Sequence, residues 1–327
     1  MVGVTGVRIA GVGHALPGRV VTNDDLAATL DTSDEWIRSR SGIATRHHVD
    51  EGTATSDLAI AAGARALEGD RRGGGDGTVD LVVVATTTPD RPCPATAPLV
   101  ASRLGLGTVP AFDVNAVCSG FLYGLSTAAA MIRGGAAGSV LLVAADTFST
   151  IVDHTDRRTA FLFGDGAGAI VLRAGGADVH EVTLGSDGGQ EELIIVPGGG
   201  SREPASSDRF FTMQGQAVYR NAVERMAGST TEVLERVGWD IAEVDRFVGH
   251  QANSRILDAV ARRLGLPPKA LVVNLDRVGN TAAASIPVAL SDAHDRGELR
   301  AGDRVVLAAF GGGATWGAAA LTWPALA

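Results

Sequence analysis

The feature that most constrains the fold is an internal repetition, in which apolar runs of the first half recur in the second half at a constant offset. Val79 precedes one apolar run and Val244 precedes another, and Val140 and Val305 begin two later runs at the same offset (244 − 79 = 165 and 305 − 140 = 165). A repeat of this kind indicates that one supersecondary unit occurs twice and that the two copies bury their apolar faces together. The chain is therefore predicted to consist of two halves, residues 1–173 and 174–327.

Each half alternates short runs of Val, Ile and Leu with longer Ala-rich segments of helical period, which is typical of a buried sheet covered by helices. The clearest strands are Asp80–Thr88, Ser139–Asp146, Arg246–Gly249 and Arg304–Phe310, and the clearest helices are Ser56–Glu68, 119–133 and 215–237. Ser56 is predicted to cap the first of these helices. The fold class is therefore predicted to be α/β, built from two duplicated α/β halves.

Composition excludes several classes of protein. The formal net charge of −9 argues against general binding to nucleic acid. The apolar runs are too short to span a bilayer, and the N-terminus does not have the pattern of a signal peptide, so we expect no membrane association. The two cysteines, Cys93 and Cys118, suggest neither a disulfide framework nor a metal cluster, and they favour a cytoplasmic location.

Cys118 lies where an extended segment gives way to a long helix, in AVCSGF. A thiol at the N-terminus of a helix gains from its positive end, which predicts a lowered pKa and a nucleophilic role. The alternative is a buried cysteine that acts as a small apolar side chain, and the residue pattern alone leaves both interpretations open.

Two polar residues in the second half are placed similarly. His250 closes an apolar strand, at the carboxyl end where α/β proteins place their sites. Asn280 precedes an Ala-rich helix at nearly the repeat offset from Cys118 (280 − 118 = 162). Their alternatives are a structural histidine and a helix cap. If the repeat is real, the ends of equivalent elements meet near a pseudo-twofold axis, so Cys118 and Asn280 are expected to face each other.

Six ordered motifs resemble those of the thiolase superfamily, and specifically the beta-ketoacyl-acyl-carrier-protein synthase III family. The resemblance covers almost the whole chain, and it implies the five-layered thiolase fold, which agrees with the duplication. The motifs are DTSDEWIRSRSGI at 31–43, AVCSGF at 116–121, FGDGAGA at 163–169, GHQAN at 249–253, GNTAAASIP at 279–287 and FGGGATWG at 310–317.

The resemblance implies an acyltransferase that makes a carbon–carbon bond. Cys118 would take the acyl group of an acyl-coenzyme A, with the N–H groups of Cys118 and Gly312 as the oxyanion hole. His250 and Asn280 would then stabilise the enolate formed by decarboxylation of malonyl-acyl carrier protein. No metal and no redox cofactor is implied.

Arg255, Arg262 and Arg263 fall at i, i+7 and i+8 on the helix after HQAN, so they would share one face. Such a face suits an acidic carrier protein, and the alternative is a solvated charged face. The resemblance implies further binding residues. The coenzyme A contacts implied are Thr32, Trp36, Arg40, Arg157 and Asn253, and the acyl-pocket residues implied are Cys93, Phe310 and Ala314. The family's pocket is completed across a twofold interface, so a homodimer is expected.

The sequence departs from the family pattern at four positions. Cys93 and Ala314 are smaller than the residues usual there, Gln216 replaces an Asn, and Arg158 replaces a Gly. These changes allow a longer, branched or aromatic acyl primer, in fatty-acid or polyketide priming. Two alternatives stay open, an acyltransferase that acts on a hydroxyl, amine or carrier thiol, and a non-catalytic partner subunit, which Cys118 disfavours.

Overall fold

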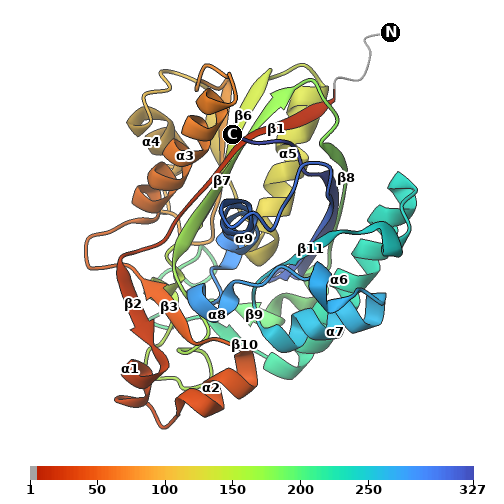
Figure 1. The fold of residues 1–327 in the computed structure, drawn as a ribbon. Helices are drawn as coiled ribbons and strands as arrows, with labels where there is room; N and C mark the ends of the chain where they lie inside the picture. The colour runs from red at the N-terminus through yellow and green to blue at the C-terminus, as the bar shows by residue number, and fades with distance from the viewer. Residues whose placement is uncertain (1–5) are drawn as a thin grey trace.

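A computed structural model describes residues 6–327 as five layers, helices alternating with sheets (Figure 1). From upper left to lower right in Figure 1, helices α3 (Thr55–Arg72) and α4 (Ala97–Arg103) cover the first sheet. Helices α5 (Gly120–Arg133) and α9 (Ser285–Asp295) fill the middle, and α6 (Gly215–Val237) and α7 (Ser254–Leu264) cover the second sheet. This is the predicted thiolase-like arrangement.

The first sheet has five strands in the order β1-β7-β6-β4-β5. Both faces of this sheet are covered by helices, which explains why its central strands are runs of Val, Leu and Ala without alternation. The strands are β1 (Val7–Ala15), β4 (Leu81–Ala85), β5 (Ala111–Val114), β6 (Ser139–Asp146) and β7 (Gly166–Ala174), and every residue of β4 and β6 is buried.

The second sheet has four strands in the order β11-β12-β13-β8. A parallel bridge from Phe247 to Leu271 stands where a fifth strand would lie. The strands are β8 (Val179–Ser186), β11 (Arg246–Gly249), β12 (Arg304–Gly311) and β13 (Thr315–Thr322).

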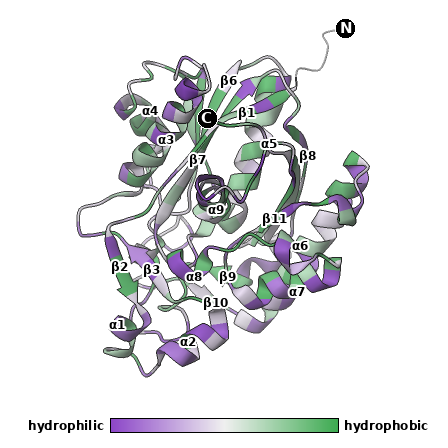
Figure 2. Cartoon of the chain, viewed as in Figure 1, coloured by the Kyte–Doolittle hydropathy of each residue, from purple (hydrophilic) through white to green (hydrophobic). Residues whose placement is uncertain are grey.

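Smaller elements surround the lower part of the molecule in Figure 1. They are β2 (Arg19–Thr22), α1 (Asn23–Ala27), α2 (Asp34–Ser41), β3 (Thr45–His48), β9 (Ile194–Ile195), β10 (Thr212–Met213) and α8 (Leu275–Val278). Hydrophilic residues concentrate on α2 and on the outer sides of α6 and α7, whereas the strands are largely hydrophobic (Figure 2).

The duplication predicted from the sequence is confirmed in the strand register. Leu81 of β4 pairs with Val140 of β6, and Arg246 of β11 pairs with Val305 of β12. The second pair is the first one shifted by the repeat offset in both members (246 − 81 = 165 and 305 − 140 = 165). Strand β7 ends at Ala174 and β8 enters the other sheet at Val179. The exact division of the chain at residue 174 stays a prediction.

The predicted match of Asn280 with Cys118 is wrong by three positions. Helix α5 begins at Gly120 and α9 at Ser285, so the helices follow the same offset as the strands (285 − 120 = 165). The structural counterpart of Cys118 is therefore Ala283, and that of Asn280 is Asn115. The error arose because both helices are Ala-rich, and composition does not fix register.

Most of the predicted elements match closely, and one predicted cap does not. Helix α6 has the predicted bounds, and β6 does too. Ser56 lies inside the first turn of α3, whose N-cap is Ala54; the Asp57 carboxylate accepts the hydrogen bond of the Ala54 N–H. Within residues 6–327, no helix is both long and apolar enough to cross a membrane.

Candidate active site

Cys118, His250 and Asn280 line one cavity of about 560 Å³, although they lie far apart in the sequence. Each comes from a different segment: a 3-10 turn before α5, the end of β11, and the loop between α8 and α9. The cavity opens to solvent between α2, α6 and α7, where Arg40, Arg220 and Arg255 line it.

Cys118 lies in a 3-10 turn, Val117–Ser119, that precedes α5. Val117 has a positive φ of 48°, a conformation that β-branched residues rarely adopt, and it turns the chain so that Cys118 reaches the cavity. Burial raises the pKa of the thiol to about 12, and the negative charge of Asp146 adds to this shift. Burial thus acts against the lowering of the Cys118 pKa that the helix terminus was predicted to cause.

Asp146 is a buried carboxylate at the end of β6. One oxygen accepts hydrogen bonds from the N–H groups of Thr87 and Thr88 and from two hydroxyls, and the other accepts the Ala283 N–H at 2.9 Å. Burial raises its pKa to about 6 despite these donors. Ala283 is the counterpart of Cys118. The first half therefore places a carboxylate, that of Asp146, against the backbone N–H of Ala283. The second half has no side chain at the equivalent place beside Cys118.

The open position lies beside Gly311, which follows Phe310 on β12 and is the counterpart of Asp146. A Cβ on Gly311 would stand 2.8 Å from the Cys118 N and 3.1 Å from the Ser119 N. Gly311 therefore leaves the Cys118 N–H uncovered by a side chain, whereas the Ser119 N–H donates to the Ala116 carbonyl at 3.1 Å. Gly312 comes next and is buried, and the Thr315 hydroxyl donates to its carbonyl at 2.9 Å. Gly312 does not itself line the cavity, so the oxyanion hole of Cys118 and Gly312 stays a prediction.

His250 directly follows β11, and its backbone N–H donates to the Ala308 carbonyl at 2.8 Å. Its Nδ1 lies 2.6 Å from the Ser285 hydroxyl. Burial lowers the pKa of the imidazole to about 4, so the ring is neutral near pH 7. A neutral imidazole in a cavity wall can donate one hydrogen bond to a substrate oxygen.

Asn280 is fixed by three hydrogen bonds. Its backbone N–H donates to the Leu162 carbonyl and its carbonyl accepts from the Gly164 N–H, both at 2.9 Å, and its Oδ1 accepts the Ala282 N–H at 2.9 Å. Because the side-chain oxygen is occupied, the amide Nδ2 group is the part of Asn280 that can donate to a ligand.

The inner wall of the cavity is aromatic and was mostly missed by sequence reasoning. Phe310 lines it, as predicted, whereas Ala314 is buried outside it and Cys93 is exposed on this chain. The residues missed are Phe161, Phe163, Ile194, Phe211, Met213 and Met226. The FLFGDG run was a usable signal for Phe161 and Phe163. The others lie on α6, on the short strands β9 and β10 and in the loop before β10, and no pattern predicts that these segments meet at the cavity. The departures Arg158 and Gln216 also line the cavity.

Four of the predicted coenzyme A residues cluster beside the cavity mouth. The guanidinium carbons of Arg157 and Arg40 lie 4.9 Å and 5.6 Å from the centroid of the Trp36 ring, and the Asn253 amide donates to the Arg40 carbonyl at 3.0 Å. Arg40 and Asn253 line the cavity. Thr32 lies just before α2, and its hydroxyl is buried without a hydrogen-bond partner among residues 6–327.

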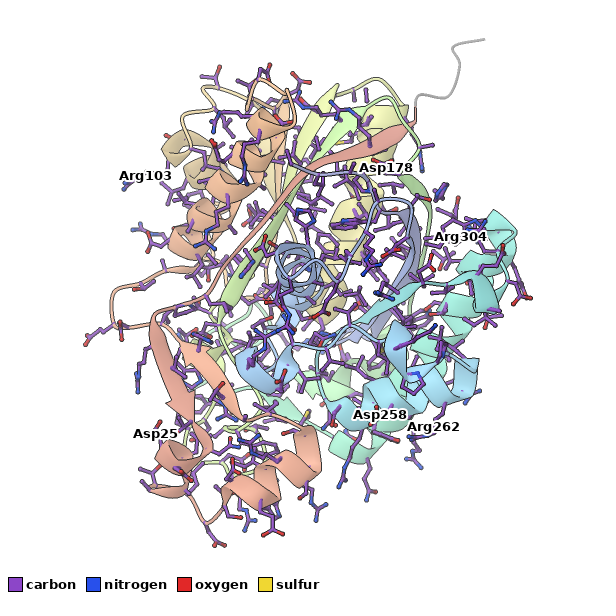
Figure 3. All side chains as sticks on the ribbon, in the orientation of Figure 1. Asp25, Arg103, Asp178, Asp258, Arg262 and Arg304 are labelled. Carbon is purple, nitrogen blue, oxygen red and sulfur yellow. The ribbon has the colours of Figure 1, made fainter. Side chains whose placement is uncertain are left out.

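The three predicted docking arginines lie on α7, as the spacing required. Arg255 lines the cavity mouth and donates to the Ser39 carbonyl at 2.6 Å, whereas Arg262 and Arg263 are exposed in the last turn. Figure 3 labels Asp258 close to Arg262 on this helix, so the face carries a negative group too. A mixed face is a weaker site for an acidic partner than a purely basic one.

Comparisons with known proteins agree with this site. Residues 112–188 match the 3-oxoacyl-acyl-carrier-protein synthase III family and residues 234–323 match its C-terminal family. The chain is 57% identical to beta-ketoacyl-acyl-carrier-protein synthase III 5 of Streptomyces coelicolor, over 97% of both chains. It superposes on 3-oxoacyl-acyl-carrier-protein synthase III of Pseudomonas aeruginosa with a TM-score of 0.93, 47% identity and coverage of 98% of this chain and 99% of that one.

A polyketide enzyme is also similar. The priming beta-ketosynthase of a polyketide biosynthetic pathway superposes with a TM-score of 0.91 and 33% identity, covering 98% of this chain and 96% of that one. Together with the shared cavity of Cys118, His250 and Asn280, these similarities show that the chain belongs to the beta-ketoacyl-acyl-carrier-protein synthase III family of condensing acyltransferases.

Proposed function

We propose that this protein condenses an acyl-coenzyme A primer with malonyl-acyl carrier protein to give a beta-ketoacyl-acyl carrier protein, as a priming step of fatty-acid or polyketide synthesis. The observation that carries the proposal is the meeting of a cysteine, a neutral histidine and an asparagine in one largely apolar cavity. Membership of the family supports the assignment of substrates.

In the first half-reaction, Cys118 Sγ attacks the thioester carbonyl of the primer. The oxyanion that develops is held by the N–H groups of Cys118 and Gly312. The carbon–sulfur bond to coenzyme A breaks, and the proton of the Cys118 thiol ends on the coenzyme A sulfur. Because one thioester replaces another, no external base is consumed, which suits a thiol whose burial raises its pKa.

In the second half-reaction, malonyl-acyl carrier protein loses CO2 and the electron pair of the broken bond becomes an enolate. His250 Nε2–H and Asn280 Nδ2–H donate hydrogen bonds to the enolate oxygen, each worth roughly 3–4 kcal/mol by analogy with oxyanion-hole donors. The carbanion carbon attacks the acyl carbonyl on Cys118. The Cys118 thiolate leaves and recovers a proton from solvent.

The binding partners follow from the same proposal. Trp36 would stack on adenine, with Arg40 and Arg157 near adenine or phosphate and Thr32 and Asn253 beside them. Neither a metal nor a redox cofactor is needed, because the thioester acidifies the neighbouring carbon and the loss of CO2 drives the condensation.

The carrier protein and the assembly are inferred more indirectly. Arg255, at the cavity mouth, with Arg262 and Arg263 would receive the carrier protein. We also propose that the protein is a homodimer, with Cys93 at the interface, and that it works in the cytoplasm, where both of its unpaired cysteines would stay reduced.

The test is to separate the two half-reactions. Incubation with a panel of acyl-coenzyme A thioesters should add one acyl mass per chain, at Cys118, and the adduct should be absent in Cys118→Ala. Adding malonyl-acyl carrier protein to the acylated enzyme should then release CO2 and form the beta-ketoacyl product. An adduct on Cys93, or transfer of the acyl group to a hydroxyl or amine without release of CO2, would refute the condensation.

A further inference from the structure

We infer that Ser285 is a positioning residue that holds His250 in the tautomer with its proton on Nε2, because the buried hydroxyl hydrogen of Ser285 has no other acceptor among residues 6–327. The inference deepens the proposed function, because it concerns the donor that stabilises the enolate. It rests on the hydrogen bonds of one buried hydroxyl, and sequence reasoning did not single out Ser285.

The direction of each hydrogen bond can be assigned. Ser285 is 1% exposed, and its Oγ has two partners among residues 6–327: the Gln251 N–H at 3.4 Å and His250 Nδ1 at 2.6 Å. A backbone N–H only donates, so Ser285 Oγ accepts there. If Oγ also accepted from a His250 Nδ1–H group, the hydroxyl hydrogen would be buried with no acceptor among residues 6–327. The arrangement that satisfies every group has Ser285 donating to His250 Nδ1, which therefore acts as the acceptor.

The Gln251 peptide is itself held in place. The Gln251 side chain is buried, donates to the carbonyls of Gly249 and Val272 at 2.7 Å and 3.2 Å, and accepts the Asn274 N–H at 3.1 Å. The bond to Gly249 closes the turn after β11, and the bonds to Val272 and Asn274 tie this turn to the next segment of the second half. The Gln251 N–H therefore keeps its aim at the Ser285 hydroxyl.

The chemical consequence lies on the other ring nitrogen. A neutral imidazole with Nδ1 as acceptor carries its proton on Nε2, and Nε2 has no hydrogen-bond partner among residues 6–327, so it is available to a ligand in the cavity. An Nε2–H group donates to an enolate oxygen. The opposite tautomer would present a lone pair there and repel that oxygen.

The duplication supplies an independent comparison. The counterparts of His250 and Ser285 in the first half are Ala85 and Gly120 (250 − 85 = 165 and 285 − 120 = 165). A Cβ on Gly120 would stand 3.3 Å from the Ala85 Cβ, so these two positions face each other in the first half as well. The second half therefore carries both the imidazole and the hydroxyl, and the first half carries neither.

Helix α9 offers a matched control. Ser291 is also buried on α9, and its hydroxyl lies 2.9 Å from Nδ1 of another histidine, His14, which does not line the cavity. Ser291→Ala removes a bond of the same kind on the same helix. Ser285→Ala and Ser291→Ala therefore differ in which histidine loses its partner.

The decisive measurement is nitrogen NMR of the full-length protein with labelled histidine, in which the His250 signals are assigned by their loss in His250→Gln. We expect an acceptor-type shift for Nδ1 and a protonated-type shift for Nε2 at pH 7. In Ser285→Ala the Nδ1 signal should move toward the tautomeric average, and in Ser291→Ala it should not. A protonated Nδ1 in the wild type would overturn the inference even if the enzyme condenses as proposed.

Kinetics provide the second arm. Ser285→Ala should lower the rate of CO2 release from malonyl-acyl carrier protein by about tenfold or more, and the rate of Cys118 acylation by less, since the loss of one hydrogen bond is felt mainly where Nε2–H acts. Ser291→Ala should leave both rates unchanged. Equal condensation by Ser285→Ala and wild type would refute the positioning role. If Ser285→Ala does not fold, Ser285→Cys, which keeps a weak donor, takes its place in both measurements.

Discussion

Three titratable side chains around the reaction site are each shifted by burial toward the neutral form. Burial raises the pKa of Cys118 to about 12 and that of Asp146 to about 6, and it lowers the pKa of His250 to about 4. A cavity of this kind suits a neutral thioester. It also penalises the malonyl carboxylate, whose charge disappears as CO2 leaves.

The pKa of His250 leads to a prediction about stability. The folded protein binds a proton at His250 only near pH 4, whereas the unfolded chain binds one near pH 6.5. Between these values the unfolded state holds more protons, so this residue's contribution to stability is complete above pH 6.5 and is lost as the pH falls toward 4. The total is on the order of 3 kcal/mol.

The measurement is urea unfolding of wild type and His250→Gln at pH 7.5 and pH 4.5. Other groups titrate in this range in both proteins, so the useful quantity is the difference between the two losses of unfolding free energy. The wild type should lose more than the variant does. Equal losses would mean that His250 is protonated normally in the fold.

Cys118 leads to a prediction about reactivity. Since burial and Asp146 raise the thiol pKa to about 12, the free enzyme holds little thiolate near pH 7. Alkylation of Cys118 by iodoacetamide, followed by peptide mass in a Cys93→Ser background, should rise about tenfold per pH unit up to the highest pH at which the fold survives. A plateau below pH 8 would show a thiolate stabilised by the helix terminus.

At the scale of elements, sequence periodicity predicted the bounds of helices and strands. It did not predict which residues that are distant in sequence meet at the cavity. The bounds of α6 and β6 follow from runs whose burial is uniform along the segment. The motif positions of Cys118, His250 and Asn280 were readable because each follows a strand or precedes a helix. The aromatic wall was not, because Phe211 reaches the cavity from the irregular segment between β9 and β10.

The contact between β7 and α9 leads to a prediction about packing. A Cβ on Gly168 of β7 would stand 2.6 Å from backbone atoms of Pro287 and Val288 on α9, and backbone cannot move aside as a side chain can. Gly168→Ala should therefore lower the free energy of unfolding by about 1–3 kcal/mol. It should also slow condensation, since α9 begins at Ser285.

Gly228 provides the matched control for that substitution. It lies inside α6, and a Cβ there would meet no atom within 4 Å. Gly228→Ala should raise the free energy of unfolding by about 0.5–1 kcal/mol, because alanine loses less backbone freedom in a helix. Urea unfolding at pH 7 measures both variants. A stabilised Gly168→Ala would show that β7 and α9 can separate without cost.

At the scale of the whole molecule, the internal repeat predicted the two stacked sheets, but a single chain leaves one boundary of the fold uncovered. Strand β5 is the outer strand of the first sheet, and its four residues are only partly buried. Beside it, residues 91–95 are all exposed, Cys93 among them, and Leu99 of α4 is 42% exposed. An open strand edge flanked by exposed apolar groups is a common site of association.

We therefore expect two copies to pair at β5, burying on the order of 2,000 Å² or more in total, as obligate homodimers do. Sedimentation equilibrium at micromolar concentration should give twice the mass of the chain. Leu99→Asp puts a charge into the expected interface and should shift the protein toward the monomer. Val273→Asp is the control, since Val273 is 43% exposed beside the opposite sheet, and it should leave the dimer intact.

If Cys93 also closes the partner's acyl pocket, the Leu99→Asp monomer should keep its fold but accept acyl groups with less discrimination by size. A wild-type monomer at these concentrations would rule out the dimer, and a Leu99→Asp dimer would place the interface elsewhere.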